Sequence, residues 1–315
     1  MQRRTFLRSL SGLGISLAGF GQSRWLGGRR AMAQPRDPEE IQAEIAAAYA
    51  RLVAALPFER VETTGREAFG RWQQLRDEGR AYPVIIGDDE ALDRVAEQFA
   101  RSSAGSPESI LMAATSLRHP QSLIDHLAEA EAQAEAALEE LQPLFKAKWE
   151  EGIRNGGIPA PGSDQMRRML ESVPILQAPA YPSPGEAHAV PGPMIIADYR
   201  GNYYPRVHIL LIPAKEMAAV PAFLRLGGWD AYPQPEYQVA ALRSWHKRLG
   251  AELVCASNDR MDILVHCRPR DESEAMALAR EIHVFCPDVV NQGPGPIEDY
   301  AVYLMQNDWW NLWWD

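Results

Sequence analysis

Apolar residues recur at helical spacing through most of residues 34–172, which predicts a mainly helical N-terminal region. Residues that cap or start helices precede several of these apolar stretches. The expected helix starts lie at Asp37, Asp88, Ser106 and His119. A further helix is expected over 65–78, and the short apolar run from Tyr82 to Ile86 predicts a strand.

The helix that follows His119 is predicted to be long. Its apolar stripe consists of Leu123, Leu127, Ala130, Ala134, Leu138 and Leu141. The same stretch carries five glutamates between positions 129 and 140, which we interpret as a solvated face and not as a cation site. Pro143 should end or bend this helix.

A proline-rich segment separates this region from the rest of the chain. Six prolines fall between positions 174 and 193, a density that no helix or central strand tolerates. We therefore predict a linker over 173–193 and a second domain over 194–315.

The second domain alternates strand and helix patterns. Strands are expected over 194–199, 207–212, 252–256 and 261–267, and helices over 236–249, 273–285 and 296–306. This order predicts an α+β fold with a small mixed or antiparallel sheet and flanking helices, preceded by the mainly helical region.

Residues 1–33 resemble a twin-arginine (Tat) export signal. The run Arg3-Arg4-Thr5-Phe6-Leu7-Arg8 fits its motif, and a mildly apolar stretch follows from Leu10 to Gly21. That stretch is too short to span a bilayer as a helix. Ala31-Met32-Ala33 fits a small-x-small cleavage site, which would leave Gln34 as the new N-terminus. An uncleaved basic helix is the alternative.

Net charge narrows the choice of partners. The chain carries a net charge of −10, and the six arginines of residues 1–33 make the remainder more acidic still. A protein with this net negative charge binds nucleic acid and anionic lipid poorly, because their phosphate groups are also negative. The sequence contains no CxxC, HExxH, GxGxxG or GxxxxGK[ST] motif, so we predict no metal and no cofactor.

From about residue 205 to the end, the chain resembles a bacterial family named domain of unknown function 4253. The resemblance rests on blocks in a fixed order, among them Gly227-Gly228-Trp229-Asp230, Leu242-Arg243-Ser244-Trp245, Phe285-Cys286-Pro287-Asp288 and the terminal Trp313-Trp314-Asp315. The family name implies no activity.

Cys286 suggests one catalytic hypothesis. His283 lies three residues earlier on the same helical face, and Asp288 follows closely, so a small hydrolase with a site around His283, Cys286 and Asp288 is our alternative function. However, Cys286 is expected at a helix C-terminus, where the helix dipole disfavours a thiolate. A packed, unreactive thiol is the simpler interpretation.

The cysteines also suggest a zinc site or a disulfide. A zinc site made of His266, Cys267, His283 and Cys286 is disfavoured, because the predicted helix would hold Cys286 about 20 Å from Cys267. Cys255 lies near the predicted hairpin tip that Cys286 should approach. Cys255–Cys286 is therefore the candidate disulfide, with three reduced thiols as the alternative.

Four tryptophans lie within the last seven residues, at positions 309, 310, 313 and 314. They suggest either a platform for stacking a ligand or a terminal segment locked into the core. If a pocket exists, we expect Trp229, Asp288, Gln292 and Asp315 around it. Arg206, Arg225 and Arg243 are candidates to balance the negative chain end.

These patterns predict an exported bacterial protein, periplasmic or secreted through the Tat route, with no stable membrane span after cleavage. The sequence contains no coherent set of acid, base and nucleophile, so we predict a non-catalytic binding or interaction module. Its partner would be an unknown protein or a small ligand, and not nucleic acid. A purely structural envelope protein is a third possibility.

Overall fold

The computed structural model describes residues 37–156, 163–164 and 192–315, apart from positions 230 and 294. The predicted signal segment, its cleavage site and most of the predicted linker lie outside the described residues. In the described part, no helix is both long and apolar enough to cross a membrane.

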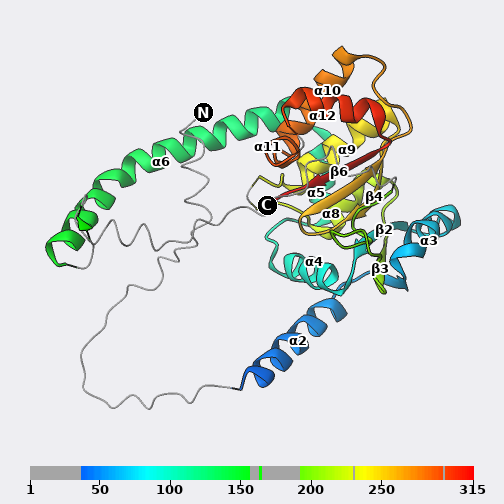
Figure 1. Cartoon of the computed structure of the whole chain (residues 1–315), viewed down its shortest axis with the longest axis horizontal. Helices are drawn as coiled ribbons and strands as arrows, with labels where there is room; N and C mark the ends of the chain where they lie inside the picture. The colour runs from blue at the N-terminus through cyan, green and yellow to red at the C-terminus, as the bar shows by residue number, and fades with distance from the viewer. Residues whose placement is uncertain (1–36, 157–162, 165–191, 230, 294) are drawn as a thin grey trace.

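One six-stranded mixed sheet organises the fold (Figure 1). Its strands, in chain order, are β1 Glu59–Thr63, β2 Tyr82–Gly87, β3 Val207–Ile212, β4 Glu252–Ala256, β5 Arg260–Leu264 and β6 Trp309–Trp313. In space the order is β1-β3-β2-β4-β5-β6. The β2–β4 pair is parallel, and the other pairs are antiparallel. The predicted α+β class is confirmed.

Helices flank this sheet. They are α2 Pro38–Ala54, α3 Gly65–Glu78, α4 Asp89–Arg101, α5 Pro107–Thr115, α6 Gln121–Arg154, α8 Val220–Leu224, α9 Pro235–Leu249, α10 Glu272–Phe285, α11 Asp288–Asn291 and α12 Ile297–Gln306. A 3-10 turn, η2, covers Met217–Ala219.

Several helices begin where side chains cap them. The Asp37 carboxylate accepts a hydrogen bond from the backbone N–H of Glu39 at 2.9 Å, and Asp88 accepts one from Ala91 at 3.0 Å. Ser106 caps α5 in the same way. Each cap satisfies one of the N–H groups that a helix start leaves without a partner. The predicted starts of these three helices are confirmed.

The core occupies both faces of the sheet. On one face, the larger apolar cluster joins the sheet to α4, α8, α9, α10 and α12. On the other, a smaller cluster includes Trp72 and Leu75 of α3. Strand β3 is buried along its whole length because its alternate residues enter the two clusters. This explains why every β3 residue except His208 is apolar.

Strands from both sides of the predicted linker share the sheet. β1 and β2 come from the N-terminal region, yet they lie on either side of β3 from the C-terminal region. Residues 194–199, predicted as a strand, instead form turns with one bridge between Ala197 and Tyr203. The Asp198 carboxylate accepts hydrogen bonds from the backbone of Arg200 and Asn202, which favours a turn.

Strand β6 forms the C-terminal edge of the sheet, and two side chains close part of it. Backbone bonds from Val265 to Asp308 and from Trp314 to Asp259 show that the backbone groups of Trp309 and Trp313 point away from β5. The Tyr303 hydroxyl donates to the Trp309 carbonyl at 2.8 Å, and the Cys286 thiol donates to the Trp313 carbonyl at 2.9 Å. These carbonyls are therefore satisfied without another strand.

Candidate functional site

The structure links three of the four predicted ligand-binding residues through the folded chain end. The Trp229 indole N–H donates to the Asn258 carbonyl at 3.2 Å, and its ring meets the Tyr232 ring edge-on. Tyr232 in turn stacks on Trp314, with ring centroids 3.8 Å apart. The Asp288 carboxylate accepts the backbone N–H of Asp315 at 3.0 Å.

The fourth residue, Gln292, is exposed at the end of α11. Because Trp310 and Trp314 are fully buried, these two tryptophans pack in the core. Arg206 and Arg243, two of the proposed partners for the chain end, form ion pairs with Asp89 and Glu216 instead. These contacts place Trp229 and Asp288 beside the folded chain end.

The thiol of Cys286 is fully buried and donates to the Trp313 carbonyl. Burial raises the pKa of this thiol far above its usual value, against the lowering effect of the backbone hydrogen bonds around it. His283 lies partly buried on α10, and the Asp288 carboxylate binds the chain end. A thiol held protonated in this way is not activated as a nucleophile.

The predicted Cys255–Cys286 disulfide does not form: all three cysteines are free. Cys255 belongs to the smaller apolar cluster and Cys286 to the larger one, so the two thiols lie on opposite faces of the sheet. The β-bulge between Leu253 and Cys255 is the reason, because it places Cys255 together with Val254 in the smaller cluster, away from the face that α10 covers. Among the described residues, no group of three or more His, Cys, Asp or Glu side chains is placed to hold a metal ion.

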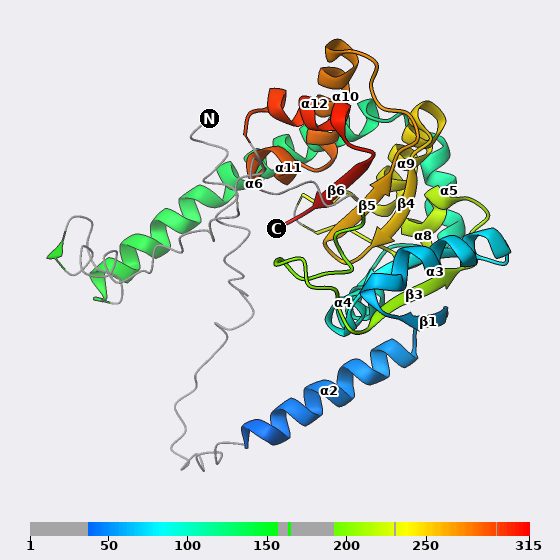
Figure 2. The same cartoon turned by 45° about the vertical axis from the view of Figure 1, so that its right-hand side comes forward.

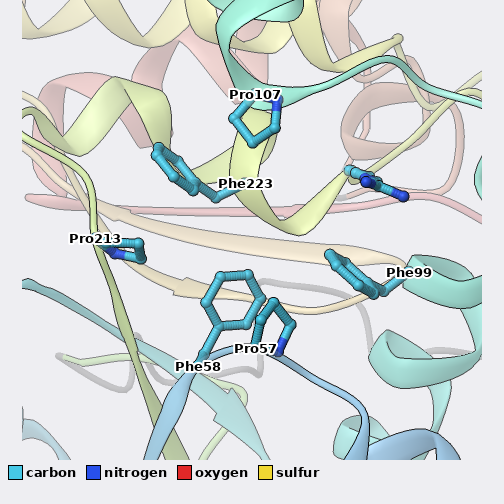
Figure 3. Close-up of a pocket in the computed structure, with 7 residues that line it drawn as sticks. Pro57, Phe58, Phe99, Pro107, Pro213 and Phe223 are labelled. Atoms are coloured by element: carbon cyan, nitrogen blue, oxygen red, sulfur yellow. The ribbon is translucent and has the colours of Figure 1, made fainter.

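The structure also contains an open apolar pocket of about 260 Å³ (Figure 3). Its lining residues are Pro57, Phe58, Phe99, Pro107, Pro213, Phe223 and Arg225. They come from the segment before β1, from α4, from the start of α5, from the end of β3 and from α8 and its C-cap. The pocket therefore exists only when both halves of the chain are folded together.

Aromatic rings form the walls of this pocket. Phe58 and Phe99 meet edge-to-face, with centroids 5.8 Å apart and an angle of 78° between the rings. In Figure 3, Phe223 and Pro107 stand across the same space from Phe58 and Pro57. Such a lining favours a flat or compact apolar group.

Arg225 supplies the one charged side chain of the lining. Its guanidinium carbon lies 4.8 Å from the centre of the Phe99 ring, in a cation–π contact. Its Nε atom is buried and has no hydrogen-bond partner. No carboxylate of the described residues forms an ion pair with it. The pocket thus combines apolar walls with a cation that can still accept an anionic partner.

The backbone at Arg225 is unusual. Its φ of 55° is the one positive φ found at a described residue other than glycine. Arg225 is the C-cap of α8, a position at which glycine is favoured because a Cβ is disfavoured in the left-handed region. An amide holds this conformation in place, since the Gln98 side chain donates to the Arg225 carbonyl at 3.2 Å. Strain of this kind concentrates at functional positions.

A second hollow, of about 200 Å³, is polar and lies beside Trp72. Arg76 and Glu252 line it, and these two side chains form an ion pair with each other. Because the charges there neutralise one another, this hollow offers a ligand less than the apolar pocket does.

Sequence reasoning did not identify the apolar pocket. It named Arg225 only as a candidate partner for the chain end, and it gave no role to Phe58, Phe99 or Phe223. The available signal in the sequence was an arginine between two apolar residues, Leu224 and Leu226. That signal does not reveal the remaining walls, which lie far away in the sequence.

Comparison with known families agrees with the resemblance of the C-terminal region. Residues 208–315, about a third of the chain, match the family described as "Domain of unknown function (DUF4253)". No curated protein and no solved structure matches the chain. The match includes Phe223 and Arg225 of the pocket, whereas Phe58, Phe99 and Pro107 lie outside it.

Proposed function

We propose that this protein is a non-catalytic binding protein whose apolar pocket holds a small ligand with an apolar body and one anionic group. The observation that carries the proposal is Arg225: a strained, unpaired cation at an otherwise apolar pocket. The positive φ costs the folded chain stability that glycine would recover, and no carboxylate among the described residues pairs with the guanidinium, whose contact with Phe99 is a cation–π contact.

The size of the pocket limits the ligand. A cavity of about 150 Å³ lined by apolar side chains accommodates benzene. A pocket of about 260 Å³ therefore suits one ring or a short branched chain that carries a carboxylate. The guanidinium can bind such a carboxylate with two parallel hydrogen bonds.

Titration with benzoate, followed by calorimetry, tests the proposal. We expect binding to the wild type, and at least about tenfold weaker binding to Arg225→Gln, because a hydrogen bond to a charged group contributes about 1.5–3 kcal/mol. Benzamide, the uncharged analogue, should bind both proteins alike. Arg243→Gln is the matched control, because Arg243 pairs with Glu216 outside the pocket.

A further variant separates strain from binding. Arg225→Gly should bind benzoate as weakly as Arg225→Gln does but melt at a higher temperature than the wild type, since glycine adopts the positive φ without cost. Equal affinity of all these variants for benzoate would contradict the proposal.

We also propose that the protein is exported through the twin-arginine route and cleaved after Ala33. The arginine pair, the mildly apolar stretch and the Ala31-Met32-Ala33 motif support this. Mass spectrometry of protein from the envelope of its host should give the mass of a chain that starts at Gln34. The mass of the uncleaved chain would overturn the cleavage proposal without affecting the pocket.

A further inference from the structure

Helix α6 extends beyond the body of the molecule and leaves an apolar face uncovered. The helix has 34 residues, which is about 51 Å at 1.5 Å per residue. Both cartoon views show its C-terminal part directed away from the sheet and the other helices (Figures 1 and 2). Within α6, all of which the structure describes, Leu123 alone is fully buried, and every residue from 127 to 151 is exposed.

The exposed apolar residues form one straight stripe. It consists of Leu127, Ala130, Ala134, Leu138, Leu141, Phe145 and Trp149. At 3.6 residues per turn these seven positions fall within an arc of about 100°. The stripe repeats after 11 residues, as in Leu127, Leu138 and Trp149, and this period keeps it on one side of a nearly straight helix. Pro143 lies on the opposite side, so its disturbance of the backbone does not interrupt the stripe.

We propose that this stripe, hereafter the α6 stripe, pairs antiparallel with the α6 stripe of a second copy of this chain. The order of large and small residues supports self-pairing. With the two-fold axis between positions 139 and 140, Leu138 faces Leu141 of the other copy. Phe145 then faces Ala134, and Trp149 faces Ala130. Large side chains thus meet small ones in every outer layer, which is the arrangement that fills a helix interface without voids.

The charges beside the stripe support the same arrangement. Glu131, Glu135 and Lys146 fall on the same flank of α6. In an antiparallel pair, equal flanks of the two helices face each other, so Lys146 of one copy lies opposite position 133 of the other, between the two glutamates. A parallel pair would bring unequal flanks together, so Lys146 would not lie opposite these two glutamates. Neither argument uses the pocket, so this proposal is independent of the proposed ligand.

The mass of the complete chain in solution tests self-pairing. Native mass spectrometry and light scattering at micromolar concentration should give twice the chain mass of 35.2 kDa. Leu141→Glu places a charge in the central layer and should raise the dissociation constant at least about a hundredfold. Leu144→Glu is the matched control: Leu144 is equally aliphatic and 61% exposed but lies off the stripe, so this variant should remain dimeric.

Cysteine cross-linking tests the orientation. In a Cys267→Ser background, which removes the exposed native thiol, a mixture of Ala130→Cys and Trp149→Cys chains should form a disulfide. Ala130→Cys chains alone should not, because an antiparallel pair holds their thiols far apart. Lys146→Glu should weaken the dimer, and adding Glu131→Lys and Glu135→Lys to it should restore the dimer.

A monomeric chain would overturn the proposal and would indicate that another part of the same chain covers the stripe. A dimer that survives Leu141→Glu would place the interface elsewhere. Cross-linking of Ala130→Cys chains alone would show a parallel pair. Any one of these results contradicts the proposed assembly.

Discussion

Replacing Glu281 by alanine is expected to lower the free energy of unfolding by about 1–3 kcal/mol, the usual cost of leaving a buried hydrogen-bonding group without its partner. Glu281 is 8% exposed. Its carboxylate accepts the Trp245 indole N–H at 2.7 Å and also pairs with Arg248. The His119 Nε2 atom lies 3.0 Å from the same carboxylate oxygen.

The cost is large because Glu281 joins separate parts of the fold. His119 immediately precedes α6, whereas Trp245 lies on α9 and Glu281 on α10. Removing the carboxylate leaves the buried Trp245 N–H without its acceptor and the buried His119 ring without its charged neighbour, and a buried polar group without a partner costs free energy. Urea denaturation at pH 7 measures the effect. Glu272→Ala, an exposed change on the same helix, is the control and should cost less than about 1 kcal/mol.

The same network gives a pH dependence. Burial alone would raise the pKa of Glu281, but the contacts with His119 and Arg248 outweigh it and hold the pKa below the usual 4.5. A lowered pKa means that the stabilising contribution is present above pH 4.5 and is lost as the pH falls through the folded-state value. The loss of stability below pH 4.5 should therefore be smaller in Glu281→Gln than in the wild type. Equal losses would contradict this assignment.

Replacing Trp314 by alanine is expected to cost about 3–5 kcal/mol, as for other large aromatic side chains in cores. Trp314 is 1% exposed, stacks on Tyr232 and meets the Phe285 ring edge-on at 5.7 Å. The substitution should leave a cavity between α10 and the chain end. Denaturation monitored by circular dichroism measures the loss.

Trp313→Ala is the control for this prediction. Trp313 is adjacent and only partly buried, so its removal should cost clearly less. A Trp314 variant with wild-type stability would contradict the assignment of the tail to the core. It would revive the alternative in which the tail tryptophans form a platform for a ligand.

Local signals accounted for much of the helical structure. Asp37, Asp88 and Ser106 cap helices as predicted, because a cap is formed between residues only two or three positions apart. The apolar stripe of α6 was also visible, although the sequence did not show that it would remain uncovered. Pro143 did not end the helix, which continues to Arg154.

The features that the sequence did not predict depend on contacts between residues far apart in the chain. Strand β1 is charged and short, and its pairing with β3 joins residues about 150 positions apart in the chain. No local pattern specifies such a partner. The apolar pocket escaped notice for the same reason, since Phe58 and Phe223 meet only after β1, β2 and β3 have assembled. Arg225 was named from the sequence as a candidate residue, but its left-handed backbone conformation was not predicted.

The position of β3 between β1 and β2 limits which fragments of the chain can fold alone. β3 has β1 on one side and β2 on the other, and β2 alone connects it to β4. A fragment limited to the matched region, 208–315, would contain most of β3 but neither of its neighbours. It would expose a mostly apolar strand with two unpaired edges, and such a strand promotes aggregation. The unit that folds is therefore larger than the matched segment, and a fragment that supplies β1 and β2 should restore its folding by complementation in trans.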